Sequence, residues 1–449
     1  MEPSGYPEYF LFFILITGIP LALLRPNKAF LYVVFLVSAA DTYTFTFTRT
    51  KLLGPYFNAH DACLIVAISS LLPHCLILRK KLLIPDVVKW ILLILGIGFI
   101  QSFYILGWKY DYFLLRSLRW ALSLPLYFVI AATLVDEKNK VRPFLIAVLV
   151  GSVVSAIEHI YFIISHTQDF LSTSSIREIR TIAFRSPGIW LLPAGIIWLP
   201  KAKFTYRILI YGSGSLFALS VLLNQTRSIW ISSVLVLPLT MFILPQKNIM
   251  IKAVVIPIAM ISLFTGMIFF KTYLLPEIKL GSIIEQRGQT LLEDNQRHYS
   301  TRTRQLAIKF ELGAWSEGIL ILGRGLNYMA SNTDDKNIAW NHLGHITTLA
   351  QLGLIGFFIY SFYLPKVIIQ GSRRLWKLPS PEIKFLGLLA CLTMIWCWIC
   401  FIMSDSFLTQ NPMRGIIFGA AWSQFVLIKS INKAPEKCFT DQSIRNIQN

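Results

Sequence analysis

Residues 341–370 read "NHLGHITTLAQLGLIGFFIYSFYLPKVIIQ", and Lys366 is the only Lys, Arg, Asp or Glu among them. An apolar run over 343–370 is longer than the roughly 20 residues that a helix needs to cross a bilayer. Two histidines, His342 and His345, lie at its beginning. The stretch therefore predicts a transmembrane helix that starts beside a pair of imidazoles.

Composition extends this prediction to the whole chain. The 449 residues are 55% hydrophobic and 14% charged, whereas soluble domains average about 25% charged residues. The mean hydropathy is +0.59. The net charge of +19 would suggest nucleic-acid binding in a soluble protein, but the basic residues form short clusters between apolar runs, as in cytoplasmic loops. The composition indicates an integral membrane protein with membrane lipid around it and no nucleic-acid partner.

Runs of suitable length and hydropathy predict an all-α, polytopic protein of 12 or 13 spans, the first two runs being the weakest. The thirteen runs cover residues 9–24, 29–48, 61–78, 87–107, 112–134, 143–165, 182–199, 208–225, 228–245, 251–270, 343–370, 383–404 and 413–430.

Charge supports this map, because every second connection is basic. The basic connections include "RPNK" (25–28), "RKK" (79–81), "DEKNKVR" (136–142) and "SRRLWK" (372–377), and the C-terminal tail is basic too. The positive-inside rule then places these connections and the tail in the cytoplasm. One long loop, 271–341, is expected outside and separates N-terminal spans (1–270) from C-terminal spans and tail (342–449). At about 70 residues it is small for an independent catalytic domain.

Cysteine and histidine spacing gives no sign of a metal centre. Five of the six cysteines lie in apolar runs and form no paired CxxC motif, so we interpret them as packing residues. His342 and His345 are one helical turn apart, but a zinc site needs at least three protein ligands and no third ligand stands beside them. We expect no metal and no other cofactor.

Several arginines fall at the predicted outer ends of spans or in the outer loop, where the positive-inside rule would deplete them. They are Arg116, Arg119, Arg185, Arg227, Arg302, Arg304 and Arg414. Because guanidinium groups bind phosphate and carboxylate in a bidentate manner, the group suggests an anion site facing the exterior, for instance for a diphosphate. The alternative for each single arginine is that it reaches the lipid headgroups or pairs with a nearby acid.

The two histidines allow two interpretations. A histidine whose pKa is near 6.5 can act as a general base toward a hydroxyl, which suits glycosyl or acyl transfer. Alternatively, an interfacial histidine forms a hydrogen bond to a neighbouring helix. Residue type alone favours the second interpretation.

Several stretches of the sequence resemble segments of the O-antigen ligase and polymerase superfamily. "HLGHITTLAQLGLIG" is similar to its pattern H-N-x-x-L-x-x-L-x-x-x-G-[LI]-[LI]-G and aligns His342 with the family's histidine, although Leu343 replaces the usual Asn. "GRGLNYM" resembles the G-x-G segment upstream. "LNQTRSIW" and "STRTRQLAIKF" resemble the segments that carry the family's arginines, at Arg227 and Arg304, with Arg302 as the alternative. "AFRSPG" offers Arg185. The resemblance covers about residues 110–430.

The resemblance implies a metal-independent glycosyltransferase of the bacterial inner membrane, with its active site on the periplasmic side. A glycan on undecaprenyl diphosphate is the donor, and arginines such as Arg227 and Arg304 hold the diphosphate. His342 deprotonates or orients the acceptor hydroxyl, while His345, one turn deeper, helps to bind substrate or packs. Arg116, Arg119 and Arg185 complete the expected substrate-binding set.

The acceptor stays open at this stage. A lipid A-core sugar would make the protein an O-antigen ligase, another lipid-linked repeat would make it a polysaccharide polymerase, and a protein hydroxyl would make it an O-oligosaccharyltransferase. A transporter or flippase of lipid-linked sugars is a further class. It predicts charges spread through the bilayer depth and repeated halves, whereas here the arginines gather at one side and no internal repeat is visible.

Overall fold

The structure is a computed structural model. It describes residues 7–39, 49–51, 56–105, 112–165, 308–313, 315–326, 344–403 and 412–445, together with single residues and short helical pieces between 204 and 244.

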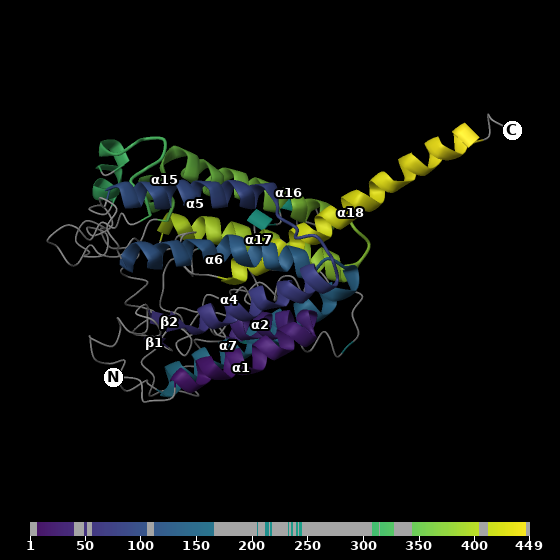
Figure 1. Ribbon diagram of the computed structural model, residues 1–449, viewed down its shortest axis with the longest axis horizontal. Helices are drawn as coiled ribbons and strands as arrows, with labels where there is room; N and C mark the ends of the chain where they lie inside the picture. The colour runs from purple at the N-terminus through teal and green to yellow at the C-terminus, as the bar shows by residue number, and fades with distance from the viewer. Residues whose placement is uncertain are drawn as a thin grey trace.

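The described elements are almost entirely helical (Figure 1). The helices are α1 (Pro7–Leu24), α2 (Pro26–Ala39), α4 (Ala59–Leu72), α5 (Asp86–Ile105), α6 (Tyr112–Leu134), α7 (Lys138–Ser165), α15 (Gly344–Phe358), α16 (Leu364–Trp376), α17 (Pro381–Met403) and α18 (Pro412–Arg445). Two π-helical turns, η1 (Pro73–Ile77) and η7 (Ile359–Tyr363), extend α4 and connect α15 to α16.

Six of the described helical segments are long and apolar enough to cross a membrane. They are Ala59–Ile77, Asp86–Tyr104, Ser117–Leu134, Lys138–Tyr161, Gly344–Trp376 and Pro381–Ile402. Shorter apolar helices cover Tyr9–Leu24, Pro26–Ala39 and Pro412–Ile428. The prediction of an all-α polytopic membrane protein is confirmed. The number of 12 or 13 spans and most of loop 271–341 fall outside the described residues, so they stay predictions.

A short antiparallel strand pair precedes α4 and was not predicted. β1 (Arg49–Lys51) pairs with β2 (Tyr56–Asn58), and α4 begins directly after β2. Asn58 accepts a hydrogen bond from the backbone N–H of Asp61, and Asp61 accepts one from the backbone N–H of Asn58. This reciprocal cap satisfies two backbone donors that a helix leaves free at its first turn.

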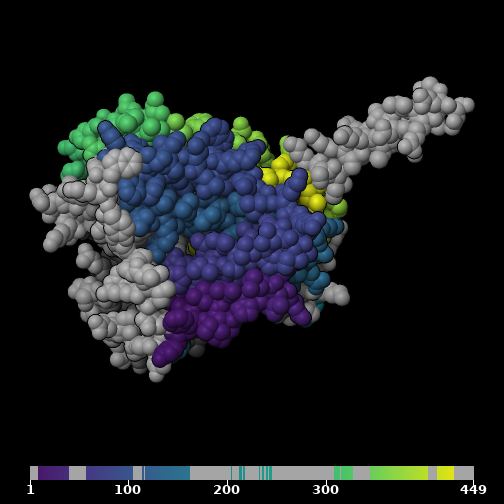
Figure 2. Space-filling view, viewed as in Figure 1, coloured from purple at the N-terminus to yellow at the C-terminus, as the bar shows by residue number. Residues whose placement is uncertain are grey.

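The core of the bundle is centred on α6, α17 and α18. Gly415 and Gly419 of α18 lie one helical turn apart, and their Cα atoms rest against the backbone of α6 near Leu124 and Phe128. Small residues at such spacing let two helices approach closely in a membrane, where packing rather than water exclusion drives association. By contrast, α5 exposes large apolar side chains, among them Trp90 and Ile100, and part of this helix lies on the face seen in Figure 2. Such exposure suits contact with lipid.

The bundle has two distinct ends. At the first, Lys80 forms ion pairs with Asp136 and Glu137 at 2.7 and 2.9 Å, and Gln424 of α18 donates a hydrogen bond to the carbonyl of Val135. The guanidinium carbon of Arg374 lies 4.9 Å from the ring of Phe425 on α18. We call this the Lys80 end. The predicted basic connections around 79–81, 136–142 and 372–377 lie at the Lys80 end, and α18 extends beyond this end (Figure 1).

Residues 308–326 and the start of α15 lie at the opposite end, which we call the Glu311 end (Figure 1). The start of α4, with its strand pair, and the start of α6 are at this end too. The separation of the two sets of connections agrees with the predicted alternation. Which side of a membrane each end faces stays a prediction.

Candidate functional site

A break in α15 organises the candidate site. Gly353 has φ of 64° and ψ of −166°, a conformation that is essentially restricted to glycine, so the helix is interrupted there. An interrupted helix leaves carbonyl groups before the break and N–H groups after it without intrahelical partners. In apolar surroundings those groups need other hydrogen bonds.

Residues 319–326 supply these bonds. Four backbone hydrogen bonds join the two segments, namely Arg324 N–H to Ala350 O, Gly325 N–H to Gln351 O, Leu354 N–H to Leu320 O and Ile355 N–H to Ile321 O, at 2.8 to 3.3 Å. Two carbonyls before the break and two N–H groups after it are therefore satisfied. We call this arrangement, with Gly323, Gly325 and Gly353, the glycine clasp.

The clasp needs glycine because the two backbones nearly touch. A Cβ atom on Gly323 would lie 2.5 Å from the amide nitrogen of Gly353, and one on Gly353 would collide with the carbonyl of Ile321. Gly323 also has a positive φ of 76°. On the other side, the N–H of Leu326 donates to the carbonyl of Gly98 at 3.3 Å, which ties the clasp to α5.

Glu311 lies beneath the first turns of α15. Glu311 belongs to the helical segment 308–313, and it is only 1% exposed. The hydroxyl of Thr347 lies 2.9 and 3.1 Å from its two carboxyl oxygens. Burial raises the pKa of Glu311, the hydrogen bond from Thr347 lowers it, and the net value is about 7. The segment lies outside the apolar spans.

Glu311 did not figure among the predicted site residues. Acids in a polar loop are usually solvated, and the flanking "IKFELGAW" gives one faint signal, because a single acid stands among apolar residues. Burial of Glu311 depends on its contact with Thr347, which is 36 positions away in the sequence. A buried carboxyl with a raised pKa is a frequent mark of a functional site.

His345 is held by protein groups on both sides of its ring. Nδ1 lies 2.7 Å from the hydroxyl of Ser361, and Nε2 lies 3.1 Å from the carbonyl of Trp398. The imidazole also makes edge contacts with the aromatic rings of Phe357, Trp398 and Phe401. This geometry favours the packing interpretation of His345, and its predicted role in substrate binding stays a prediction.

Two of the outer arginines have partners within the bundle. Nη1 of Arg119 lies 3.1 Å from a carboxyl oxygen of Asp61, the residue that caps α4. Arg414 is 2% exposed, and its guanidinium carbon lies 4.8 Å from the centre of the Phe401 ring. For Arg119 the structure thus favours the alternative of pairing with a nearby acid. Whether it also binds an anion stays a prediction.

Most predicted site residues fall outside the described part of the chain. These are His342, Arg185, Arg227, Arg302 and Arg304, and for Arg116 only the backbone of α6 is described. His342 precedes the first residue of α15 by two positions. The described residues bring together Glu311 and Thr347 at the first turns of α15, with the glycine clasp further along the same helix.

Within the described ranges, no group of three or more His, Cys, Asp or Glu side chains could hold a metal ion.

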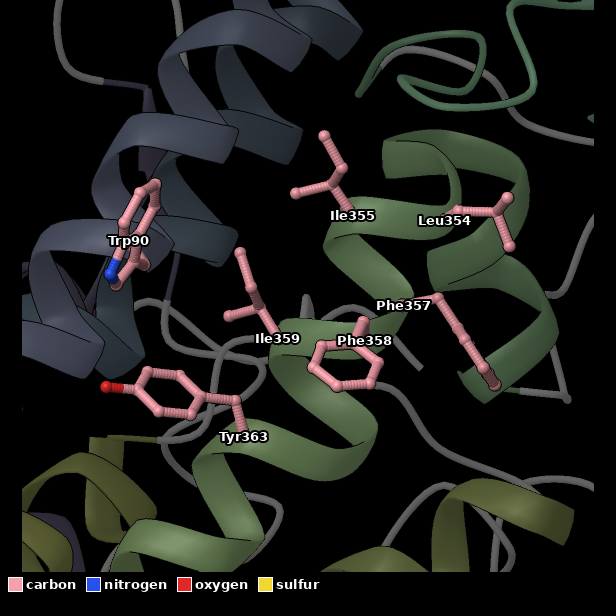
Figure 3. Close-up of a pocket in the computed structure, with 7 residues that line it drawn as sticks. All are labelled: Trp90, Leu354, Ile355, Phe357, Phe358, Ile359 and Tyr363. Atoms are coloured by element: carbon pink, nitrogen blue, oxygen red, sulfur yellow. The ribbon is translucent and has the colours of Figure 1, made fainter.

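An apolar groove of about 700 Å³ lies between α5 and the α15–η7 segment (Figure 3). Trp90 faces Ile359 and Tyr363 across it (Figure 3). Its lining offers dispersion contacts and almost no polar groups, so it suits a hydrocarbon chain rather than chemistry.

Comparison with known proteins adds no assignment, since no protein-family model matches the chain and no curated protein matches it either.

Proposed function

We propose that this protein is a membrane-embedded glycosyltransferase that moves a glycan from undecaprenyl diphosphate to an acceptor hydroxyl, in the manner of an O-antigen ligase. One observation carries the proposal. The two sequence stretches that resemble the family, "GRGLNYM" and "HLGHITTLAQLGLIG", are joined in space by the backbone hydrogen bonds of the glycine clasp. A fixed support of this kind is what a reactive residue at the start of α15 needs.

In the proposed reaction, the oxygen of the acceptor hydroxyl attacks the anomeric carbon of the donor glycan. The bond between that carbon and the diphosphate oxygen breaks, and its electron pair stays on the diphosphate. His342 takes the proton from the acceptor. Arg227 and Arg304, with Arg302 and Arg185 as further candidates, stabilise the negative charge that grows on the leaving group. The mechanism implied by the resemblance uses no metal and no nucleotide.

The reaction is proposed to take place on the periplasmic side of the bacterial inner membrane. The basic connections at the Lys80 end support this orientation, because cytoplasmic loops are enriched in Lys and Arg. The Glu311 end would then face the periplasm, where the lipid-linked glycan and a lipid A-core acceptor are both accessible.

A transporter receives less support from the break in α15. In transporters, interrupted helices leave backbone groups free to bind ions or substrate near the middle of the bilayer. Here two of the carbonyls and two of the N–H groups released at Gly353 are bonded to residues 319–326. The break therefore serves to hold two segments together.

The proposal is tested with purified protein in nanodiscs and a glycan on undecaprenyl diphosphate. Product on lipid A-core would support a ligase, and lengthened glycan on the carrier would support the polymerase alternative. We expect His342→Ala to lower transfer by at least about 100-fold, a typical contribution of a general base. The donor left unchanged by the wild-type protein under all conditions would overturn the proposal.

A matched control is His60→Ala, which removes another histidine at the same end of the bundle, in the first turn of α4. It should retain wild-type transfer. Both variants are compared at equal amounts of protein with equal melting temperatures, so that loss of folding is not taken for loss of chemistry. Full activity in folded His342→Ala would remove the catalytic assignment.

A further inference from the structure

The environment of Glu311 is incomplete for an ionised carboxylate. An ionised carboxylate has about four acceptor positions, whereas the Thr347 hydroxyl has one proton to donate. No other hydrogen bond and no ion pair involves Glu311 within the described residues. Because the residue is buried, water does not supply the missing partners. The described surroundings therefore favour a carboxyl that gains and loses a proton.

The charged and titratable groups near this position are engaged elsewhere. On the same segment, Lys309 is exposed and Glu317 pairs with Arg324 at 2.7 Å. On α15, His345 lies two residues from Thr347, about 200° around the helix, and bonds to Ser361 and Trp398. No described titratable side chain of α5 or α17, which pack against α15, forms a hydrogen bond or an ion pair with Glu311. Among the described residues, no neighbouring charge fixes the protonation state of Glu311.

We propose that Glu311 is the positioning and proton-accepting residue behind the reactive end of α15. This inference rests on the proposed function and adds the destination of the proton. The acceptor hydroxyl loses its proton as its oxygen bonds to the anomeric carbon, and the diphosphate leaves with the electron pair of the broken bond. The proton that leaves the acceptor ends on the Glu311 carboxylate, which becomes a neutral acid, and it returns to water once the product has left and the site is open.

Two features of the structure suit this role. The glycine clasp anchors residues 319–326, immediately after the Glu311 segment, to the break in α15, so the carboxyl is held beside the first turns of the helix. In addition, a pKa of about 7 lets Glu311 exchange protons near neutral pH. A surface glutamate, with a pKa near 4.3, would be a weaker acceptor.

The test compares the pH dependence of transfer in the wild type, Glu311→Gln, Glu311→Asp and the control Glu317→Gln. The control makes the same chemical change six positions away, at an exposed residue. We expect Glu311→Gln to lower kcat by at least about tenfold and to change the pH profile of kcat near pH 7, because only the titration of the general base would then shape it. Glu311→Asp should restore part of the rate, and Glu317→Gln should match the wild type.

A merely structural role would lower the melting temperature and leave the pH profile of kcat the same as in the wild type, and that result would overturn the inference. A second measurement needs no activity. Infrared difference spectra between about pH 5 and pH 9 should contain a protonated-carboxyl band that Glu311→Gln removes and Glu317→Gln retains. Absence of that band would overturn the proton site. An inactive wild type that still shows the band would overturn the proposed function and, with it, the role in transfer.

Discussion

At the Lys80 end, Asp136 accepts hydrogen bonds from Lys80 and Lys140, and Glu137 accepts one from Lys80. At the other end of the bundle, Glu311 is more deeply buried and receives a hydrogen bond from a threonine hydroxyl. Both sites connect segments that are distant in the sequence. They differ in the partner of the carboxyl group, which is a lysine ammonium at the Lys80 end and, among the described residues, a threonine hydroxyl at the Glu311 end.

The consequence is a pKa shift of opposite sign at the two ends. Burial alone would raise the pKa of Asp136, but hydrogen bonds from Lys140 and Lys80 outweigh burial and lower it. The hydrogen bond from Lys80 likewise lowers the pKa of Glu137. At Glu311, burial prevails and the pKa rises to about 7. Paired carboxylates join connections at one end, whereas at the other end Glu311, which has no cation beside it among the described residues, can exchange protons.

The largest expected effect comes from breaking the Glu311 end at its clasp with Gly353→Ala. The new methyl would collide with the carbonyl of Ile321, in a backbone conformation that costs a non-glycine residue about 1–3 kcal/mol before any collision. We expect a loss of at least about 3 kcal/mol of stability, seen as a lower melting temperature and less folded protein in size-exclusion chromatography.

The control for this variant is Gly96→Ala on α5, where an added Cβ would meet no atom within 4 Å. It should leave the melting temperature nearly unchanged. If Gly353→Ala melts at the same temperature as Gly96→Ala, the clasp does not hold the Glu311 end together.

The contrast between the ends also shows what the sequence can predict. Runs 87–107 and 112–134 match α5 and α6 closely, since apolar length and alternating loop charge are local properties of the chain. The break at Gly353 was not predicted, because it depends on hydrogen bonds to residues 319–326. The strand pair before α4 and the burial of Glu311 were missed for the same reason, since each depends on contacts through space.

A second prediction uses the sign of the Glu311 shift. Between its unfolded pKa of about 4.5 and its folded value of about 7, folded Glu311 keeps a proton that the unfolded chain has lost. Stability from this group is therefore fully present below about pH 4.5 and lost as the pH rises through about 7. The loss amounts to roughly 3 kcal/mol. Thermal unfolding at pH 5 and pH 8 measures it.

Glu311→Gln should flatten this dependence, because the amide does not titrate, and Glu317→Gln should preserve it. The quantity to compare is the difference in melting temperature between the two pH values for each variant. An equal difference in wild type and Glu311→Gln would mean that Glu311 is not the group that binds the proton.

The smallest effect is expected at the Lys80 end, from Lys80→Met. The Lys80 side chain is 38% exposed and Asp136 keeps its bond to Lys140, so solvent screening and the remaining partner limit the loss to about 1 kcal/mol or less. Lowered acid pKa values give the opposite pH dependence. The contribution is present above the unfolded pKa of Asp136, 3.8, and is lost as the pH falls through the lower folded value. The melting temperatures of the wild type and Lys80→Met should therefore converge on acidification.

The control Lys89→Met breaks a more exposed ion pair with Asp86 and should change the melting temperature even less. A larger loss in Lys80→Met than in Gly353→Ala would reverse the comparison, because the ion pairs, and not the clasp, would then dominate the stability of the bundle.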